Sequence, residues 1–106
     1  MHYTPTDERV WQQQAANGLL SLLKTASDNE LPVIPWTVGP GRLLFARIDA
    51  PEGRRQLFEL WAAALHLTDR RETAPGDRIT LTASGELGGI TVRIITDIWT
   101  EDEQRA

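Results

Sequence analysis

The stretch from Val33 to Leu67 places the strongest constraint on the fold of this 106-residue chain. It alternates as two short strands around the turn Gly39–Gly41, and the apolar spacing then changes to that of an amphipathic helix. Alternate side chains of a strand point to opposite faces, and a three-residue turn pairs Val38 with Arg42. The predicted inner face consists of Ile34, Trp36, Val38, Leu44, Ala46 and Ile48. This face needs a cover, and the helix predicted over residues 51–67 supplies one.

A longer helix is predicted before this stretch, over residues 4–27. Thr4 can cap it, with Pro5 at the first helical position and Asp7 three residues beyond the cap. Its apolar residues recur at three- and four-residue spacing, as in Trp11, Ala15, Leu19, Leu22, Leu23 and Ala26. Gly18 lies within this stripe, where it would allow a close approach to a neighbouring backbone.

The remaining segments complete the predicted fold. Asp49 and Glu52 have the spacing of a capping box for the second helix. Residues 68–76 are polar and predict a loop, while residues 78–84 and 90–99 alternate as strands around a glycine-rich turn at 85–89. We therefore expect an α+β fold with the order αββαββ, in which both helices pack on one face of a four-stranded antiparallel sheet. Residues 1–100 form a single domain in this interpretation, and residues 101–106 form an acidic disordered tail.

The composition excludes several kinds of site. The chain has no cysteine, which removes disulfides, thiolate metal ligands and a cysteine nucleophile. The first residues lack the basic and apolar regions of a signal peptide, and no apolar run approaches the ~20 residues that span a bilayer. We expect a cytoplasmic protein without membrane association.

No group of residues in the sequence predicts catalysis. His2 and His66 are the two histidines, and His66 falls in the last turn of the second helix, where a cation complements the helix dipole. The turn Gly39–Gly41 lacks the Lys-Ser/Thr pair of a phosphate-binding loop and joins two strands. The sequence therefore predicts a protein that is not an enzyme and that holds no cofactor and no metal ion.

The predicted outer face of the sheet carries the most informative functional pattern. Strand alternation places the apolar side chains Leu43, Phe45, Ile95 and Trp99 there, beside Arg93. Such an apolar patch on an uncovered face is typical of an interface. We therefore predict a protein–protein interaction or regulatory module that forms a homodimer through its open sheet face.

Two other functions fit the sequence less well. A DNA-binding regulator could use Arg54, Arg55, Arg70 and Arg71, which flank the second helix, but the net charge of −4 disfavours broad phosphate binding and nearby carboxylates offer each arginine a partner. A small-ligand-binding module would need an apolar cavity between sheet and helices.

Several stretches resemble known sequences. The segment from Leu31 to Trp36, the turn Gly39–Gly41, the helix from Phe58 to Leu65 and the strand from Ile90 to Trp99 look like parts of small uncharacterised actinobacterial proteins, some from phage or plasmid gene sets. The resemblance implies a fold and a source, and it transfers no functional residue.

Overall fold

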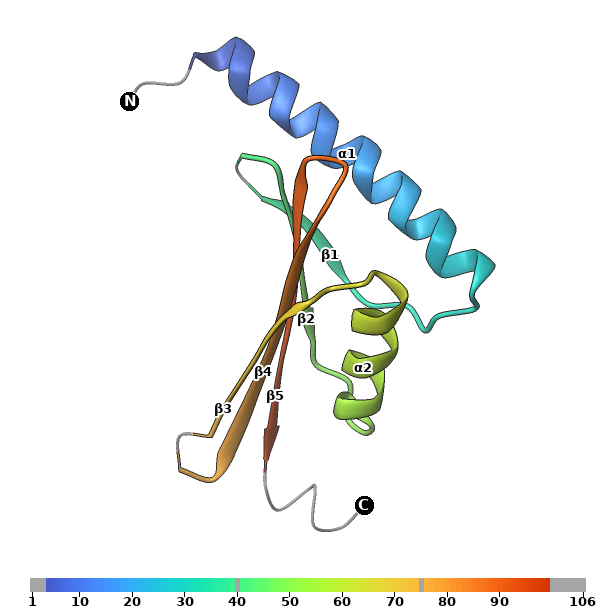
Figure 1. Ribbon diagram of the computed structural model, residues 1–106, viewed down its shortest axis with the longest axis vertical. Coiled ribbons are helices and arrows are strands. Elements are labelled where there is room, and N and C mark those ends of the chain that lie inside the picture. Colours follow the sequence, from blue (N-terminus) through green and yellow to red (C-terminus); the bar gives the residue numbers. More distant parts are fainter. Residues whose placement is uncertain (1–3, 40, 75, 100–106) are drawn as a thin grey trace.

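The computed structural model describes residues 4–39, 41–74 and 76–99, which form an α+β fold (Figure 1). The elements in chain order are α1 (Pro5–Asp28), β1 (Trp36–Gly39), β2 (Leu43–Ile48), α2 (Arg54–Ala64), β3 (Asp69–Thr73), β4 (Arg78–Leu87) and β5 (Ile90–Trp99). The strands build one sheet in the order β1-β2-β5-β4-β3. Both helices lie on the same face of this sheet, as predicted (Figure 1).

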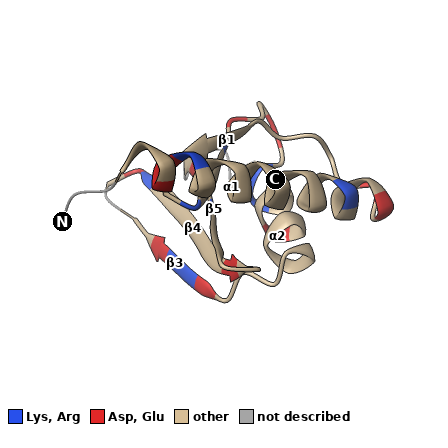
Figure 2. Cartoon of the chain, turned by 90° about the horizontal axis from the view of Figure 1, so that it is seen from above, with Lys and Arg blue, Asp and Glu red and all other residues tan. Residues whose placement is uncertain are grey.

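The predicted four-stranded antiparallel sheet is wrong in two respects. Residues 69–73, predicted as loop, form the edge strand β3, which pairs antiparallel with β4. Every residue of β3 is exposed and most are charged (Figure 2), so this strand leaves no apolar alternation in the sequence. In addition, β5 pairs in parallel with β2, which is possible because α2 and the β3–β4 hairpin form the long crossover that parallel strands need.

The hairpin of β1 and β2 keeps the predicted faces although its register differs. Trp36 pairs with Ala46 and Val38 with Leu44, which is a shift of two residues from the predicted pairs. Because side chains alternate with a period of two, an even shift leaves each residue on its face. Four of the six predicted inner residues are buried, and the other two, Trp36 and Val38, are half-buried against the core.

The limits of α1 follow from its caps. The amide of Asp7 donates to Thr4 Oγ1 over 3.1 Å, and the amide of Thr4 donates to Asp7 Oδ2 over 3.3 Å, which confirms the predicted capping box. At the other end Glu30 adopts φ 53°, and the amide of Leu31 donates to the carbonyl of Ala26 over 2.9 Å. This Schellman turn ends the helix and directs the chain towards β1.

Close packing at Gly18 holds α1 against the sheet. A Cβ atom on Gly18 would overlap Cδ1 of Ile90, the first residue of β5, so the close neighbour is a side chain and not the backbone that was predicted. Ala15, Leu22 and Ala26 are the buried residues of α1. Across its first turns, by contrast, the helix is exposed apart from half-buried Trp11.

The start of α2 differs from the predicted capping box at Asp49 and Glu52. The helix begins at Arg54, after Gly53 in the left-handed region at φ 69°. Nε of Arg54 donates to the carbonyl of Ala50 over 2.6 Å, and a second guanidinium nitrogen donates to the carbonyl of Asp97 over 2.7 Å. Because a guanidinium only donates, Arg54 caps none of the free amides at the start of α2, but it ties this end of the helix to the end of β5.

The end of α2 repeats the geometry seen in α1. His66 adopts φ 54°, and the amide of Leu67 donates to the carbonyl of Ala62 over 3.0 Å. His66 thus has a structural position in a second Schellman turn. Leu67 is buried and would contact any Cβ at Gly85, where the structure continues β4 through the predicted turn as far as Leu87.

The chain then reverses at Gly88 and Gly89, both at positive φ, as a tight two-residue hairpin favours.

The core lies between the inner face of the sheet and the two helices. Trp61 and Phe58 of α2 are its largest fully buried side chains. Nε1 of Trp61 donates to the carbonyl of Pro32 over 3.0 Å, and its ring meets Trp36 edge to face, with centroids 5.6 Å apart. These contacts fix the segment between α1 and β1. Within the described ranges, neither helix is both long and apolar enough to cross a membrane.

Candidate interaction surface

The face of the sheet opposite the helices, called the outer face below, is the candidate site. The central strand β5 contributes Thr91, Arg93, Ile95, Asp97 and Trp99, and β2 contributes Leu43, Phe45 and Arg47. Their neighbours in sequence on these strands are buried under the helices, with Leu44, Val92 and Ile94 almost inaccessible to water. Strand alternation therefore separates a dry inner face from an outer face that the two helices leave open.

The structure brings four of the five predicted interface residues together. Phe45 pairs with Arg93 in the parallel ladder, and Ile95 is the next outward residue on β5. Leu43 is the preceding outward residue on β2. Leu43, Phe45 and Ile95 are half-buried because cross-strand neighbours cover their sides, while Arg93 is exposed.

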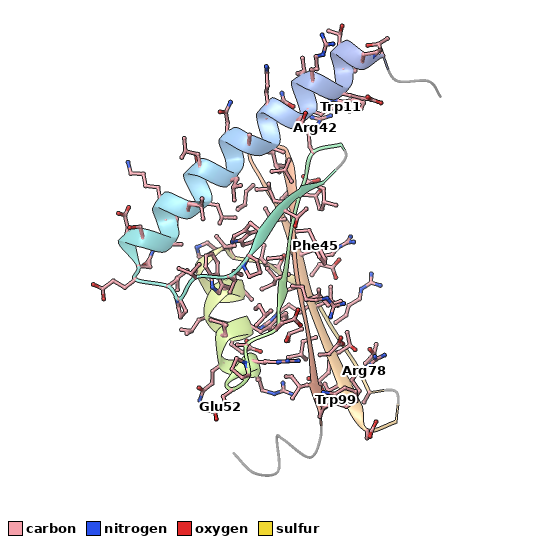
Figure 3. All side chains as sticks on the ribbon, turned by 180° about the vertical axis from the view of Figure 1, so that it is seen from behind. Trp11, Arg42, Phe45, Glu52, Arg78 and Trp99 are labelled. Atoms are coloured by element: carbon pink, nitrogen blue, oxygen red, sulfur yellow. The ribbon has the colours of Figure 1, made fainter. Side chains whose placement is uncertain are left out.

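Trp99 stands apart from this group. It is 47% exposed and pairs with Arg78 at the far end of β5. An extended strand spans ~26 Å from Thr91, beside Leu43, to Trp99. Figure 3 shows Phe45 about halfway along the sheet and Trp99 at its end near Arg78. The predicted patch therefore has two separate parts. One is the cluster of Leu43, Phe45, Arg93 and Ile95, and the other is Trp99.

A polar network centred on Asp97 separates the two parts. Asp97 Oδ2 lies 2.9 Å from a guanidinium nitrogen of Arg47, and Thr80 Oγ1 donates to Asp97 Oδ1 over 2.7 Å. Nε of Arg78 lies 3.9 Å from the same carboxylate. The Thr80 hydrogen bond and then the Arg47 contact hold the pKa of Asp97 below its ordinary value. The negative charge of Asp97 is thus compensated within one subunit.

Sequence reasoning missed this network. Asp97 and Arg47 are 50 residues apart, and they meet only because β5 inserts between β2 and β4. The available signal was an acidic residue at an outward position of a long apolar strand, but its partners depend on strand order.

The arginines proposed for nucleic acid contact other groups of the protein. Arg54 binds the carbonyls of Ala50 and Asp97, as described above. Arg55 lies 3.2 Å from Glu72, and Arg70 pairs with Glu59, so that both pairs join α2 to β3. Arg71 lies 3.7 Å from Asp69 on its own strand. These contacts place the four arginines beside carboxylates or carbonyl groups.

A groove of about 590 Å³ opens between the start of α1 and the β1–β2 hairpin. Its lining residues are Glu8, Trp11, Gln12, Val38, Gly39, Gly41 and Arg42. The guanidinium of Arg42 lies 5.9 Å from the centre of the Trp11 ring, at the distance of a cation–π contact (Figure 3). The groove is open and mixed in polarity, unlike the apolar cavity that a small-ligand module would need. In the described part of the chain, no three His, Asp or Glu side chains are grouped to hold a metal ion.

Comparison with known proteins adds no relative: no protein-family model, curated protein or solved structure matches this chain.

Proposed function

We propose that this chain is a non-enzymatic protein–protein interaction module that forms a homodimer through the outer face. The observation that carries the proposal is Trp99, a 47% exposed aromatic residue on the central strand of an uncovered sheet. The half-buried cluster of Leu43, Phe45 and Ile95 lies farther along the same face. Aromatic residues of this kind are frequent anchors of interfaces.

A second copy fits this face for a physical reason. An isologous contact buries the same residues on both subunits, so each apolar residue of the face leaves water in one copy and again in the other. At ~25 cal/mol per Å², a few hundred Å² of apolar burial per subunit would contribute several kcal/mol before the entropy of association is subtracted. The Asp97 carboxylate already has Arg47 and Thr80 as partners, so its burial leaves no unpaired charge.

Sedimentation velocity of the unmodified protein and of Trp99→Asp tests the proposal. We expect a dimer for the unmodified chain and a monomer for the variant, with unchanged far-ultraviolet circular dichroism. Val33→Asp is the matched control, because Val33 is 96% exposed and lies outside the outer face. A monomeric unmodified protein at high micromolar concentration would exclude the homodimer.

A further inference from the structure

The two edges of the sheet are held in different ways. The edge strand β1 contributes Trp36 and Val38 to the inner face, where both pack against the core. The opposite edge strand β3 contains no apolar residue, and every one of its residues is exposed (Figure 2). Because the burial of apolar surface is the main favourable contribution to folding, β3 lacks the contribution that holds β1 in place.

Charged side chains take the place of apolar ones on the inner side of β3. Arg70 and Glu72 pair with buried residues of β4, so both side chains lie on the helix side of the sheet. Arg70 pairs with Glu59 of α2, and Glu72 lies 3.2 Å from Arg55 of α2. These four side chains are between 37% and 57% exposed, so water and salt screen both ion pairs.

Arg70 also covers part of the core. Its guanidinium lies 5.7 Å from the centre of the Phe58 ring, at the distance of a cation–π contact. Phe58 is only 2% exposed. A long charged side chain can cover apolar surface with its stem while its charged group stays in water. The position of β3 therefore determines whether this side of Phe58 is accessible.

We propose that β3 is a strap that opens as a unit while the rest of the sheet stays folded, and that its ion pairs with α2 set how often it opens. Segments with few buried apolar contacts open locally at a lower free energy than the whole fold. Opening breaks the ladder between β3 and β4 and uncovers Phe58. An unpaired strand edge is a template for another strand, so the strap controls access to the edge of β4.

The strap does not depend on the proposed homodimer. Arg70 and Glu72 lie on the helix side of the sheet, whereas the homodimer would use the outer face. The same exchange pattern is therefore expected in the unmodified chain and in the Trp99→Asp variant.

Hydrogen exchange of the β4 amides, measured by NMR, is the first test. Residues 80–84 of β4 pair antiparallel with both β3 and β5, so alternate residues direct their amides to one strand or to the other. The β3-directed amides should exchange through strap opening, at least about tenfold faster than the β5-directed amides, which exchange only when the sheet unfolds. Uniform protection along residues 80–84 would overturn the proposal.

Variants of the two ion pairs test what holds the strap. Glu72→Gln removes the ion pair with Arg55 and should raise the exchange rate of the β3-directed amides about threefold. Arg70→Gln removes both the ion pair with Glu59 and the cover of Phe58, so its effect should be larger, about tenfold. Arg71→Ala is the matched control, because the ion pair of Arg71 is with Asp69 on its own strand. Equal acceleration by Arg71→Ala and Arg70→Gln would show that the ties to α2 do not hold the strap.

A core variant separates strap opening from global unfolding. Leu22→Ala removes a buried side chain of α1, which stays packed when only the strap opens. It should accelerate the β5-directed amides alone, whereas Arg70→Gln should accelerate both sets, since its contacts are lost in both kinds of opening. If Leu22→Ala accelerates both sets equally, the strap does not open separately.

Salt is the last test. Raising the salt concentration from about 0.1 M to about 1 M shortens the Debye length from ~10 Å to ~3 Å. In the unmodified chain this should accelerate the β3-directed amides by about as much as Glu72→Gln does. The acceleration should disappear in the variant that combines Arg70→Gln with Glu72→Gln. A salt effect of the same size in both proteins would contradict the role of the ion pairs.

Discussion

The outer face of the sheet and the exposed flank of α1 that carries Leu20 and Leu23 expose apolar side chains in different ways. On the outer face, Leu43, Phe45 and Ile95 are half-buried between polar cross-strand neighbours, and only Trp99 is widely exposed. On α1, Leu20 and Leu23 extend from a helix flank without such neighbours. A residue in a sheet has cross-strand neighbours on the same face, whereas a residue on a helix flank has neighbours only along its own helix. Equal hydrophobicity in the sequence therefore gives unequal exposure in the fold.

The two surfaces also treat charge differently. On the outer face Asp97 gathers Arg47, Thr80 and Arg78 within one subunit. On α1 the stretch from Val10 to Leu23, which includes the exposed Leu20, has no charged residue. The carboxylate of Asp97 is therefore compensated within its own subunit, whereas the exposed flank of α1 around Leu20 has no charge to compensate.

The variant with the largest expected effect on stability tests whether the sheet and α1 unfold as one cooperative unit. Trp61→Ala should lower the free energy of unfolding by about 3–5 kcal/mol, because it removes a fully buried indole from the core. Trp61 also holds the segment after α1 through the carbonyl of Pro32. Urea unfolding followed by circular dichroism and by tryptophan fluorescence should give coincident transitions. Separate transitions would mean that α1 unfolds independently of the sheet.

The next effect compares one residue from each surface directly. Phe45→Ala should destabilise the monomer by about 2 kcal/mol, because Phe45 is half-buried among its neighbours. Leu20→Ala should change monomer stability by no more than about 0.5 kcal/mol, since an exposed helical leucine has little to lose. Denaturant unfolding at submicromolar concentration measures both without association. Equal losses would remove the distinction between the two surfaces.

A smaller effect concerns how α1 is seated. Gly18→Ala gains up to about 1 kcal/mol of helix propensity but forces its methyl group against Ile90. In an Ile90→Val background that atom of Ile90 is absent, so the same change should become stabilising. A double-mutant cycle of unfolding free energies should therefore give a coupling of about 1 kcal/mol. Strictly additive changes would show that Gly18 does not set the distance between helix and sheet.

The smallest effect is the pH dependence of the outer face. Because the folded-state pKa of Asp97 lies below its ordinary value of 3.8, ionised Asp97 stabilises the fold above that pH. This contribution is lost as the pH falls from about 4 through the folded-state pKa. Asp97→Asn should therefore unfold more easily at neutral pH, by about 1 kcal/mol for a partly exposed pair, and lose less stability on acidification. Parallel pH profiles for the two proteins would contradict the network.

The elements that could be predicted from sequence are those with local causes. The capping box of Thr4 and Asp7 acts within one helical turn, and it was predicted correctly. The faces of β1 and β2 were also correct, because a period of two tolerates an even error in register. The start of α2 was wrong: the helix begins after Gly53 in the left-handed region, and Arg54 binds the carbonyl of Asp97, far along the chain.

The candidate interface was predicted in its members but not in its arrangement. Alternation placed Leu43, Phe45 and Ile95 on one face, and the structure agrees. It could not place Asp97 between this cluster and Trp99, because a face assignment contains no information about which polar groups meet. The apolar spacing on α1 predicted a single stripe for the core, and Leu23 was wrongly included in it. Only the packing shows that Ala15, Leu22 and Ala26 are used and that Leu20 and Leu23 remain exposed.

The sequence by itself determined the two helices, the face of each apolar strand residue and the absence of thiol chemistry, because these depend on residue type and on spacing of a few positions. The tertiary structure decided the strand order, the parallel pairing of β2 with β5 and the edge strand β3. It also decided the partners of Asp97 and the exposure of Leu20. These features depend on contacts between residues that the chain brings together from distant positions, and no local periodicity encodes such contacts.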